Sequence, residues 1–307
     1  MYENAAELLY QAEQKRAPLW RIVLDNETEL TGATAKQVEE KMLCSYRVML
    51  CSAQTAVTDV KKVKGALIAG QAKALHRYHK NNEGLCGTLM QKAMQRALSC
   101  VEVNASMGKI CAAPTAGACG ILPAVVISIC ETFHEDEKQA VRALLTASGI
   151  GAVVMANATV SGAKGGCQAE CGVAAAMAAG AAVFLRNGTN EQVLRAASLA
   201  LICTLGLVCD PVGGYVQIPC AYRNVSQTAS ALACADMALA GIDARIPFDE
   251  AVQAMWEVGE MLPSALRETA KGGVAATPAA EELAKQIKKS FANIMEEPDG
   301  KENSFLR

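Results

Sequence analysis

Apolar residues in the first third of the chain recur at intervals of three and four positions. This spacing places them on one face of an α-helix, whereas the strict alternation that is typical of a β-strand is scarce. A hydroxyl at Thr31 or Thr34 can accept a hydrogen bond from the free amides at the start of the third helix and so cap it. The pattern predicts helices over residues 5–15, 19–30, 34–55 and 85–105.

The pattern changes after residue 105, where segments rich in glycine and proline alternate with strongly apolar stretches. The glycine-rich segments are 106–120, 161–172 and 209–220. The longest apolar stretches, 173–185 and 196–209, are shorter than the roughly 20 residues that span a bilayer, so we interpret them as buried helices. Because buried backbone must find hydrogen-bond partners, glycine-rich segments between buried helices usually gather around a ligand. We therefore expect the functional site in these three segments.

Helical periodicity resumes beyond the third glycine-rich segment and predicts helices over residues 222–240, 247–261 and 278–292. Pro247 and Pro278 suit the first turn of a helix, where a missing amide hydrogen breaks no bond. Residues 296–307 are expected to be frayed. The sequence thus predicts an all-α fold, a compact multi-helix domain whose glycine-rich loops converge on a buried site.

The composition favours one tightly packed core. The chain of 307 residues is 51% hydrophobic but only 4% aromatic, so its helices must pack through small side chains. We expect a single domain over residues 1–307, made of an N-terminal helical part (about 1–105), a core that carries the site (about 106–240) and C-terminal helices (about 241–295).

Charge and the N-terminal residues restrict the function classes. A net charge of −2 supplies no electrostatic reason to bind nucleic acid or an acidic membrane surface, so we expect neither as a partner. Residues 1–15 are polar and acidic, without the basic and apolar parts of a signal peptide. We expect a cytoplasmic protein that acts on a small neutral or zwitterionic substrate.

Cysteine is unusually frequent. The chain has 13 cysteines, and the odd number excludes a complete set of intrachain disulfides. Most cysteines are expected to be small buried hydrophobes. Cys167, Cys209 and Cys220 differ, because each lies where a glycine-rich segment meets a predicted helix, a place where backbone amides and the helix dipole stabilise a thiolate. No compact C-x-x-C pair is present, so spacing alone identifies no metal.

Three sequence motifs carry a family resemblance. They are GCQAECG at 166–172, CDPVGGYVQIPC at 209–220, and NASMGKI at 104–110 followed by APTAGACGILPA at 113–124. The chain resembles the alpha region of iron-sulfur-dependent L-serine dehydratases over most of its length. The resemblance implies a 4Fe-4S cluster held by Cys167, Cys209 and Cys220, with the fourth iron open to L-serine as a Lewis acid. The implied products are pyruvate and ammonia, which makes the chain an L-serine ammonia-lyase alpha subunit.

The resemblance also implies a partner. Single-chain relatives read Pro-Thr-Asn-Gly where this sequence has Ala116, as two-chain members do. We expect a separate beta chain that completes the active site and covers the mouth of the three glycine-rich segments, and a higher oligomer. No general base is assigned, since His76, His79 and His134 lie outside the motifs. The two histidines at 76 and 79 fit an exposed basic face better than a metal site.

The remaining candidate residues are weighed against structural roles. We predict substrate contacts for Ser106, Met107, Gly108, Thr115, Ala116 and Gly117. Catalytic roles are predicted for Lys109, Thr115 and Glu170, although a lysine in a loop is often only solvated and Glu170 can equally cap the following helix. Cys171 is expected in the core rather than as a ligand.

Other functions remain compatible with these residues. A cluster-dependent lyase could act on threonine or cysteine, and three cysteines would also suffice for a redox or cluster-carrier protein. A Schiff base of pyridoxal phosphate with Lys109 or Lys164 is disfavoured, because the glycine-rich phosphate cradle and lysine motif of that class are absent.

Overall fold

The computed structural model describes residues 1–60, 65 and 67–296, and in this part of the chain the fold is all-α, as predicted. No strand forms there, and Cys209 and Arg267 make one isolated parallel bridge. The α-helices are α1 (Ala5–Lys15), α2 (Leu19–Thr31), α3 (Ala35–Thr58), α4 (Gln71–Asn81), α5 (Thr88–Ala105), α6 (Ile121–Phe133), α7 (Glu137–Asn157), α8 (Gly162–Gly165), α9 (Val173–Leu185), α10 (Asn190–Ile202), α11 (Cys220–Leu239), α12 (Phe248–Met261) and α13 (Pro278–Glu296).

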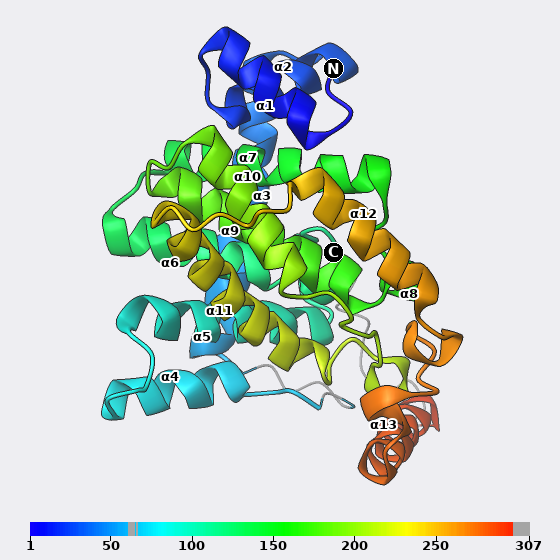
Figure 1. Cartoon of the computed structure of the whole chain (residues 1–307). Helices are drawn as coiled ribbons and strands as arrows, with labels where there is room; N and C mark the ends of the chain where they lie inside the picture. The colour runs from blue at the N-terminus through cyan, green and yellow to red at the C-terminus, as the bar shows by residue number, and fades with distance from the viewer. Residues whose placement is uncertain (61–64, 66, 297–307) are drawn as a thin grey trace.

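Short helical turns lie between them. They are the 3-10 helices η1 (Ala116–Ala118), η3 (Val212–Gly214), η4 (Ser264–Leu266) and η5 (Gly273–Ala276), and the π-helix η2 (Gln168–Gly172). In Figure 1, α1 and α2 lie at the top, α4 at the lower left, and α13 at the lower right beside η3 and η5.

Side-chain caps define several helix starts. Thr34 forms a capping box with Gln37 at the start of α3, and Thr189 forms one with Gln192 at the start of α10. In each box the hydroxyl accepts from a first-turn amide and the glutamine returns a hydrogen bond to the backbone of the cap. The predicted cap at Thr34 is confirmed, whereas Thr31 is the last residue of α2.

Helix α9 forms the centre of the molecule. All of its residues except Phe184 are buried, and α6, α7, α10 and α11 pack around it (Figure 1). Missing side chains allow this close packing: a Cβ at Gly180 would overlap the Ile150 side chain of α7, and one at Gly151 would lie 3.1 Å from the Met177 sulfur. The small-residue core expected from the composition is therefore present.

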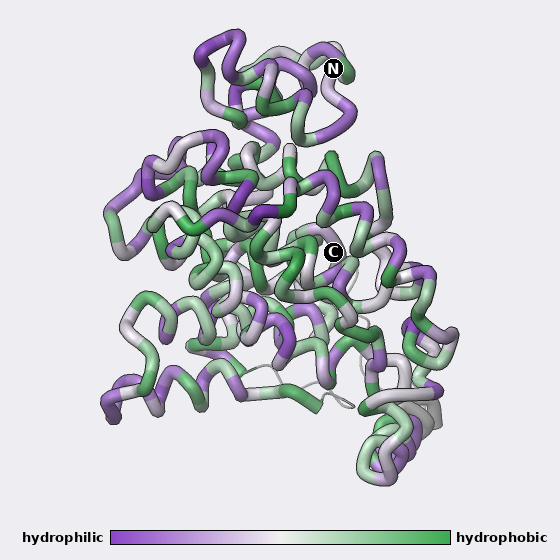
Figure 2. The backbone as a smooth tube through the Cα atoms, in the orientation of Figure 1, coloured by the Kyte–Doolittle hydropathy of each residue, from purple (hydrophilic) through white to green (hydrophobic). Residues whose placement is uncertain are grey.

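The buried apolar residues form one large cluster that draws on helices from α1 to α12. A second, small cluster of Leu24, Val38, Val141 and Leu145 lies between α2, α3 and α7. Figure 2 shows hydrophilic stretches along outlying helices such as α1 and α4, and hydrophobic stretches in the interior. One continuous core thus supports the segments that carry the three motifs.

Some predicted boundaries are wrong. The apolar stretch 196–209 is not one helix, because α10 ends at Ile202 and Gly206, with a φ of +84°, turns the chain toward Cys209. Pro247 precedes α12 as its N-cap, while Pro278 begins α13 as predicted. Helices α4, α6 and α7 were not predicted individually. Except for Glu296, which ends α13, the segment predicted to be frayed lies outside the described residues.

Three segments are long and apolar enough to cross a membrane by length and composition. They are Ala116–Phe133, Glu137–Asn157 and Gln168–Leu185. The third is longer than the stretch 173–185 read from the sequence, since η2 continues into α9. In the fold, 72%, 67% and 89% of the respective apolar windows are buried inside the protein. Burial in the core therefore accounts for their apolar character.

Candidate functional site

The three cysteines of the motifs come together from separate elements. Cys167 immediately precedes η2, Cys209 lies in the loop after α10, and Cys220 is the first residue of α11. Burial raises the pKa of Cys209, and the charges of Glu170 and Cys167 raise it further. Burial and the charge of Cys167 likewise raise the pKa of Cys220, to about 12. Such mutual effects require proximity, so the predicted ligands share one buried site.

A hydrogen bond between cysteines sets Cys167 apart. Cys171, four residues further along, is buried and donates to the Cys167 sulfur. This bond is the main reason why the pKa of Cys167 is lowered, and the Arg223 guanidinium lowers it too, against the effect of burial. Cys171 therefore lies in the core as predicted, and it also contacts a predicted ligand.

The carboxylate of Glu170 lies among these groups. The Cys209 sulfur donates to its Oε2 at 3.8 Å, and a Cβ at Gly117 would lie 3.4 Å from its Oε1. Burial raises the pKa of Glu170, the nearby Thr115 hydroxyl lowers it, and the charge of Glu268 raises it. Glu170 belongs to η2 and makes no capping bond to α9, so the alternative role as a helix cap is wrong.

The second glycine-rich segment leaves room beside the cysteines. A Cβ at Gly162 would lie 2.6 Å from Oε2 of Glu170 and 2.9 Å from the sulfur of Cys209. Any side chain here would displace these groups, so the close approach requires glycine. The hydroxyl of Thr115 is also buried. Within the described residues it has no well-aligned hydrogen bond, although it is near enough to Glu170 to affect the pKa of that carboxyl.

The side chains around the three cysteines indicate which kind of metal group the site could hold. Among the described residues, no three His, Cys, Asp or Glu side chains are arranged for a single metal ion. An iron-sulfur cluster is wider than one ion, and its ligands are thiolates. Two buried thiols and the half-buried thiol of Cys220 come from three segments. Together with a glycine at the position where a side chain would intrude and a buried hydroxyl without a firm partner, they suit such a cluster. The residues present fit the group that the motifs imply.

Only some residues of the first glycine-rich segment lie close to the cysteines. Thr115 and Gly117 lie beside Glu170, whereas Ala116 between them is exposed. The side-chain amide of Asn104 donates to the Ala116 carbonyl at 3.4 Å and so joins the residue 104–110 loop to this segment. Of the predicted substrate residues, the structure thus brings Thr115 and Gly117 to the cysteines, with Ala116 at the rim.

The loop after α5 is more exposed. Ser106 directs its hydroxyl to the Val103 carbonyl at 3.0 Å, and Met107, Gly108 and Lys109 are exposed. Met107 is 91% exposed and has a positive φ of 59°. The structure does not bring these four predicted residues into contact with the cysteines, so their roles stay predictions.

Asn224, which sequence reasoning missed, connects two of the motifs. It is fully buried, donates to the carbonyls of Gly117 at 2.7 Å and Cys220 at 2.9 Å, and accepts from the Gly120 amide at 2.9 Å. The signal was its place four residues after Cys220, on the same face of α11. Asn224 fixes the Thr115 segment against the cysteine at the start of that helix.

Gln168 has a similar connecting role. Its side chain is buried, donates to the Met255 carbonyl of α12 at 3.0 Å and accepts from the Gly206 amide at 2.8 Å. Its own amide donates to the Leu207 carbonyl at 2.9 Å. The loop that carries Cys209 is thus attached directly to the residue after Cys167.

Asp210 and Arg223 form a buried ion pair that sequence reasoning also missed. Asp210 is 2% exposed, and its Oδ1 lies 2.7 Å from Nη1 of Arg223. Arg223 also donates to the Val208 carbonyl at 2.7 Å, and its charge lies near enough to the Cys167 thiol to lower the pKa of that thiol. Asp210 follows Cys209 directly and Arg223 lies three residues after Cys220, which was the signal available.

Other candidates lie elsewhere. His76 and His79 each pair with the Gln95 side chain of α5 at 2.9 Å, so they are held by a neighbouring helix rather than forming a purely solvated face. Most cysteines are expected to pack as small buried hydrophobes, and this is wrong for Cys44, Cys51, Cys86 and Cys203, which are exposed.

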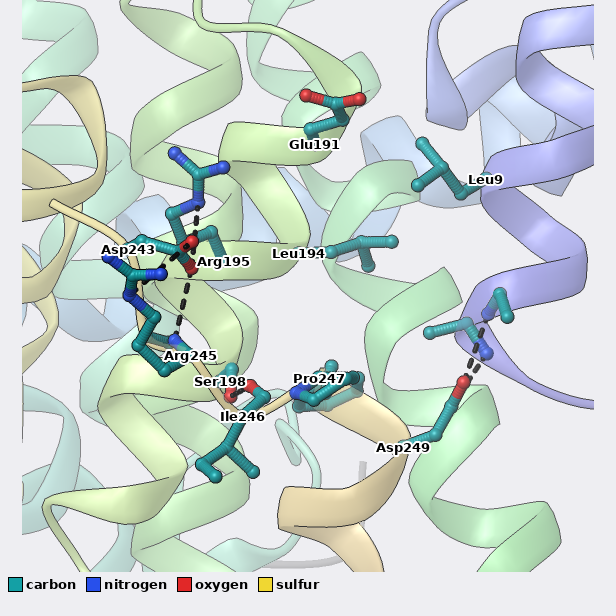
Figure 3. A pocket seen from close by; sticks show the side chains of 14 residues that line it. Leu9, Glu191, Leu194, Arg195, Ser198, Asp243, Arg245, Ile246, Pro247 and Asp249 are labelled. Carbon is teal, nitrogen blue, oxygen red and sulfur yellow. Dashed lines mark hydrogen bonds and ion pairs between the residues drawn. The ribbon is translucent and has the colours of Figure 1, made fainter. Parts of the chain in front are cut away.

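A cavity of about 580 Å³ lies between α1, α10 and the loop before α12, and none of the predicted site residues lines it. Figure 3 shows Arg195 and Arg245 around Asp243 there.

Known proteins are similar to this chain in sequence over most of its length. Residues 14–275 match the family described as serine dehydratase alpha chain. A probable L-serine dehydratase alpha chain of Bacillus subtilis (strain 168) is 42% identical over 94% of this chain and 95% of its own length. The L-serine dehydratase alpha chain of Peptoniphilus asaccharolyticus is 42% identical over 94% of this chain and 99% of its own length.

Longer proteins are similar as well. L-serine dehydratase 1 of Escherichia coli (strain K12) is 34% identical over 89% of this chain, and the match spans 61% of that protein. The family that the three motifs indicated is thus confirmed by similarity over nearly the whole chain. The chain belongs to the serine dehydratase alpha chain family.

Proposed function

We propose that the chain is the alpha subunit of an L-serine ammonia-lyase, which eliminates water from L-serine and yields pyruvate and ammonia with a 4Fe-4S cluster on Cys167, Cys209 and Cys220. Membership of the family supports the reaction class. The observation that carries the proposal is the meeting of these three thiols, two of them buried, with Glu170. Sulfur ligands favour an iron-sulfur group over a hard cation.

When bound, the cluster would supply an iron without a thiolate, a Lewis acid that makes the serine hydroxyl a better leaving group. The chain contributes the enclosure. Cys167 and Cys209 are nearly inaccessible to solvent, and the Gln168 side chain ties their two segments together. A dry, rigid surrounding strengthens electrostatic interactions at the reacting atoms.

Glu170 lies beside Cys209, and Thr115 lies beside Glu170. Glu170 can hold or accept a proton at Oε1 or Oε2, and the buried Thr115 hydroxyl has capacity for a further hydrogen bond to a substrate oxygen. Gly117 allows a small amino acid to approach this carboxylate. We therefore assign proton transfer to Glu170 and substrate orientation to Thr115 and Gly117.

Lys109 and its neighbours are assigned to substrate binding at the exposed rim of the site. The exposed Lys109 carries a cation that can pair with the serine carboxylate, and Asn104 joins its loop to Ala116. Because this loop is exposed, we propose that Lys109 contacts the substrate only when a partner protein covers the loop. Exposed apolar side chains lie in or beside the site-forming segments: Met107, Leu205, Tyr222 and Val274.

A separate beta chain is the proposed cover. The match to L-serine dehydratase 1 of Escherichia coli (strain K12) spans 61% of that protein, so that protein has further residues outside the match. Apolar side chains exposed near a site are typical of an interaction surface. We propose that the beta chain binds here, that the complex is a higher oligomer, and that it works in the cytoplasm.

An anaerobic assay tests the proposal. The chain is reconstituted with ferrous iron and sulfide, mixed with its candidate beta chain, and supplied with L-serine without an electron acceptor. We expect stoichiometric pyruvate and ammonia, with slower turnover of L-threonine and L-cysteine. Iron incorporation without any pyruvate, but with electron transfer to a redox partner, would instead assign the chain to the cluster carriers.

A further inference from the structure

A largely buried cation lies beside the thiol of Cys167. Arg223 lies in the first turn of α11, three residues after Cys220, and its side chain is 15% exposed. The guanidinium donates to the Val208 carbonyl, pairs with Asp210 and lies beside the Cys167 thiol, whose pKa its charge lowers. One side chain thus reaches all three segments that hold the predicted ligands.

The backbone around Asp210 restricts the position of this cation. Oδ2 of Asp210 accepts from the Val274 amide at 2.6 Å. Gly273 has a φ of +62°, and a Cβ at this position would lie 2.8 Å from Cγ of Asp210. The carboxylate therefore has η5 on one side and Arg223 on the other, which leaves the guanidinium little freedom to turn away from Cys167.

The same C-terminal segment holds Cys209. The Cys209 amide donates to the Leu266 carbonyl at 2.9 Å, and the Glu268 amide donates to the Cys209 carbonyl at 2.7 Å. Residues 264–276 therefore fix Cys209 and Asp210 together. Movement of either would be transmitted to Cys167 through Arg223.

We infer that Arg223 is a positioning residue, which, held by Asp210, donates a charge-assisted hydrogen bond to the Cys167 sulfur and thereby stabilises the ligand set and raises the reduction potential of the bound cluster. The inference rests on the proposed function. Hydrogen bonds to sulfur and net charge near a cluster set its potential, and charge-assisted bonds are the stronger ones. A nearby positive charge favours the reduced, more negative cluster.

Substitutions can separate the effect of the positive charge of Arg223 from the effect of its hydrogen-bonding geometry. Arg223→Lys keeps the positive charge but loses the planar fork that reaches several acceptors. Arg223→Gln removes the charge. Asp210→Asn keeps the size of the side chain and an acceptor for the Val274 amide, but it releases the guanidinium. Arg245→Gln is the matched control, because Arg245 also pairs with an aspartate, Asp243, but is exposed.

The test uses the full chain, reconstituted anaerobically, with two readouts. The reduction potential of the cluster is measured by redox titration followed by electron paramagnetic resonance, and iron loss is timed in the presence of a chelator. We expect a more negative potential and several-fold faster iron loss for Arg223→Gln. Arg223→Lys should keep the potential near that of the unmodified chain but lose iron faster. Asp210→Asn should also lose iron faster, and Arg245→Gln should change neither quantity.

The outcomes separate this inference from the proposed function. If the unmodified chain takes up no cluster, both are wrong. If it holds a cluster and Arg223→Gln leaves the potential and the rate of iron loss unchanged, only the role of Arg223 is wrong. Circular dichroism reports whether each variant folds. Should Arg223→Gln not fold, normal iron loss in both Arg223→Lys and Asp210→Asn would overturn the inference.

Discussion

At the scale of single residues, the carboxylate of Glu170 is the group that is best placed for proton transfer. It accepts from Cys209, faces two glycines and lies beside Thr115, whereas each histidine of the chain lies outside the three motifs. A group placed between the predicted ligands and the predicted substrate residues can transfer a proton without moving far.

Replacing Glu170 by Gln tests this role. The amide retains the size and most hydrogen bonds of the side chain but does not accept a proton from substrate. We expect normal iron and sulfide content with kcat lowered about 10²-fold or more, as is usual for the loss of a general acid or base. Glu268→Gln is the control, since Glu268 affects Glu170 through charge alone. Unchanged kcat in Glu170→Gln would remove Glu170 from the reaction.

The buried hydrogen bonds of Asn224 lead to a second prediction at this scale. Asn224→Ala leaves the Gly120 amide and the Gly117 carbonyl buried without a partner, and each such loss costs about 1–3 kcal/mol. We expect a lower free energy of unfolding by denaturant and weaker retention of iron. Asn82→Ala, which removes an exposed hydrogen bond to Tyr78, should leave both nearly unchanged. Equal stability of the two variants would contradict the connecting role.

At the scale of elements, α9 shows how much the pattern of small residues determines. The stretch 173–185 was predicted as a buried helix and is one, because all its faces are apolar. The stretch 196–209 looked similar but breaks at Ile202, since Gly206 adopts a positive φ that only the loop to Cys209 requires. Periodicity does not distinguish a buried helix from a buried apolar turn.

The contact of α9 with α7 gives a stability prediction. Gly180→Ala introduces a methyl group into the Ile150 side chain, and overpacking of this kind costs about 1–3 kcal/mol. The double variant with Ile150→Val removes the overlapping methyl and should recover part of the loss in denaturant unfolding. Additive destabilisation by the two changes would show that α9 and α7 do not meet as described.

The site illustrates the limit of sequence reasoning at this scale. The motifs named the three cysteines, Thr115 and Glu170, which the fold brings together. Sequence reasoning missed Asn224, Arg223 and the segment 264–276, because their contacts join residues distant in the chain. Local spacing identifies residues that react, but long-range hydrogen bonds that hold them become visible only in the fold.

At the scale of the whole molecule, the site lies at the edge of the helical body rather than at its centre. The cysteine segments are joined to α12 and to η5 near α13, and the Met107 loop is exposed. The exposed Met107 loop leaves this edge accessible to a partner. This arrangement agrees with the proposed division of the enzyme into two chains.

The division predicts the activity of the isolated chain. Loaded with cluster but without the beta chain, it should turn over L-serine poorly, and addition of the beta chain should raise the rate at least tenfold. Met107→Glu places a charge on the proposed contact surface and should weaken this stimulation, with iron content unchanged. Full activity of the isolated chain, unaffected by the beta chain, would show that the site is complete here.

The central claim is that Cys167, Cys209 and Cys220 together hold one cluster, and iron and sulfide analysis tests it most directly. After anaerobic reconstitution, the unmodified chain and the exposed-thiol control Cys44→Ser should each contain about four irons and four sulfides per chain. Cys167→Ser, Cys209→Ser and Cys220→Ser should each retain little of either. Full iron and sulfide in any one of these three variants, or none in the unmodified chain, would contradict the assignment.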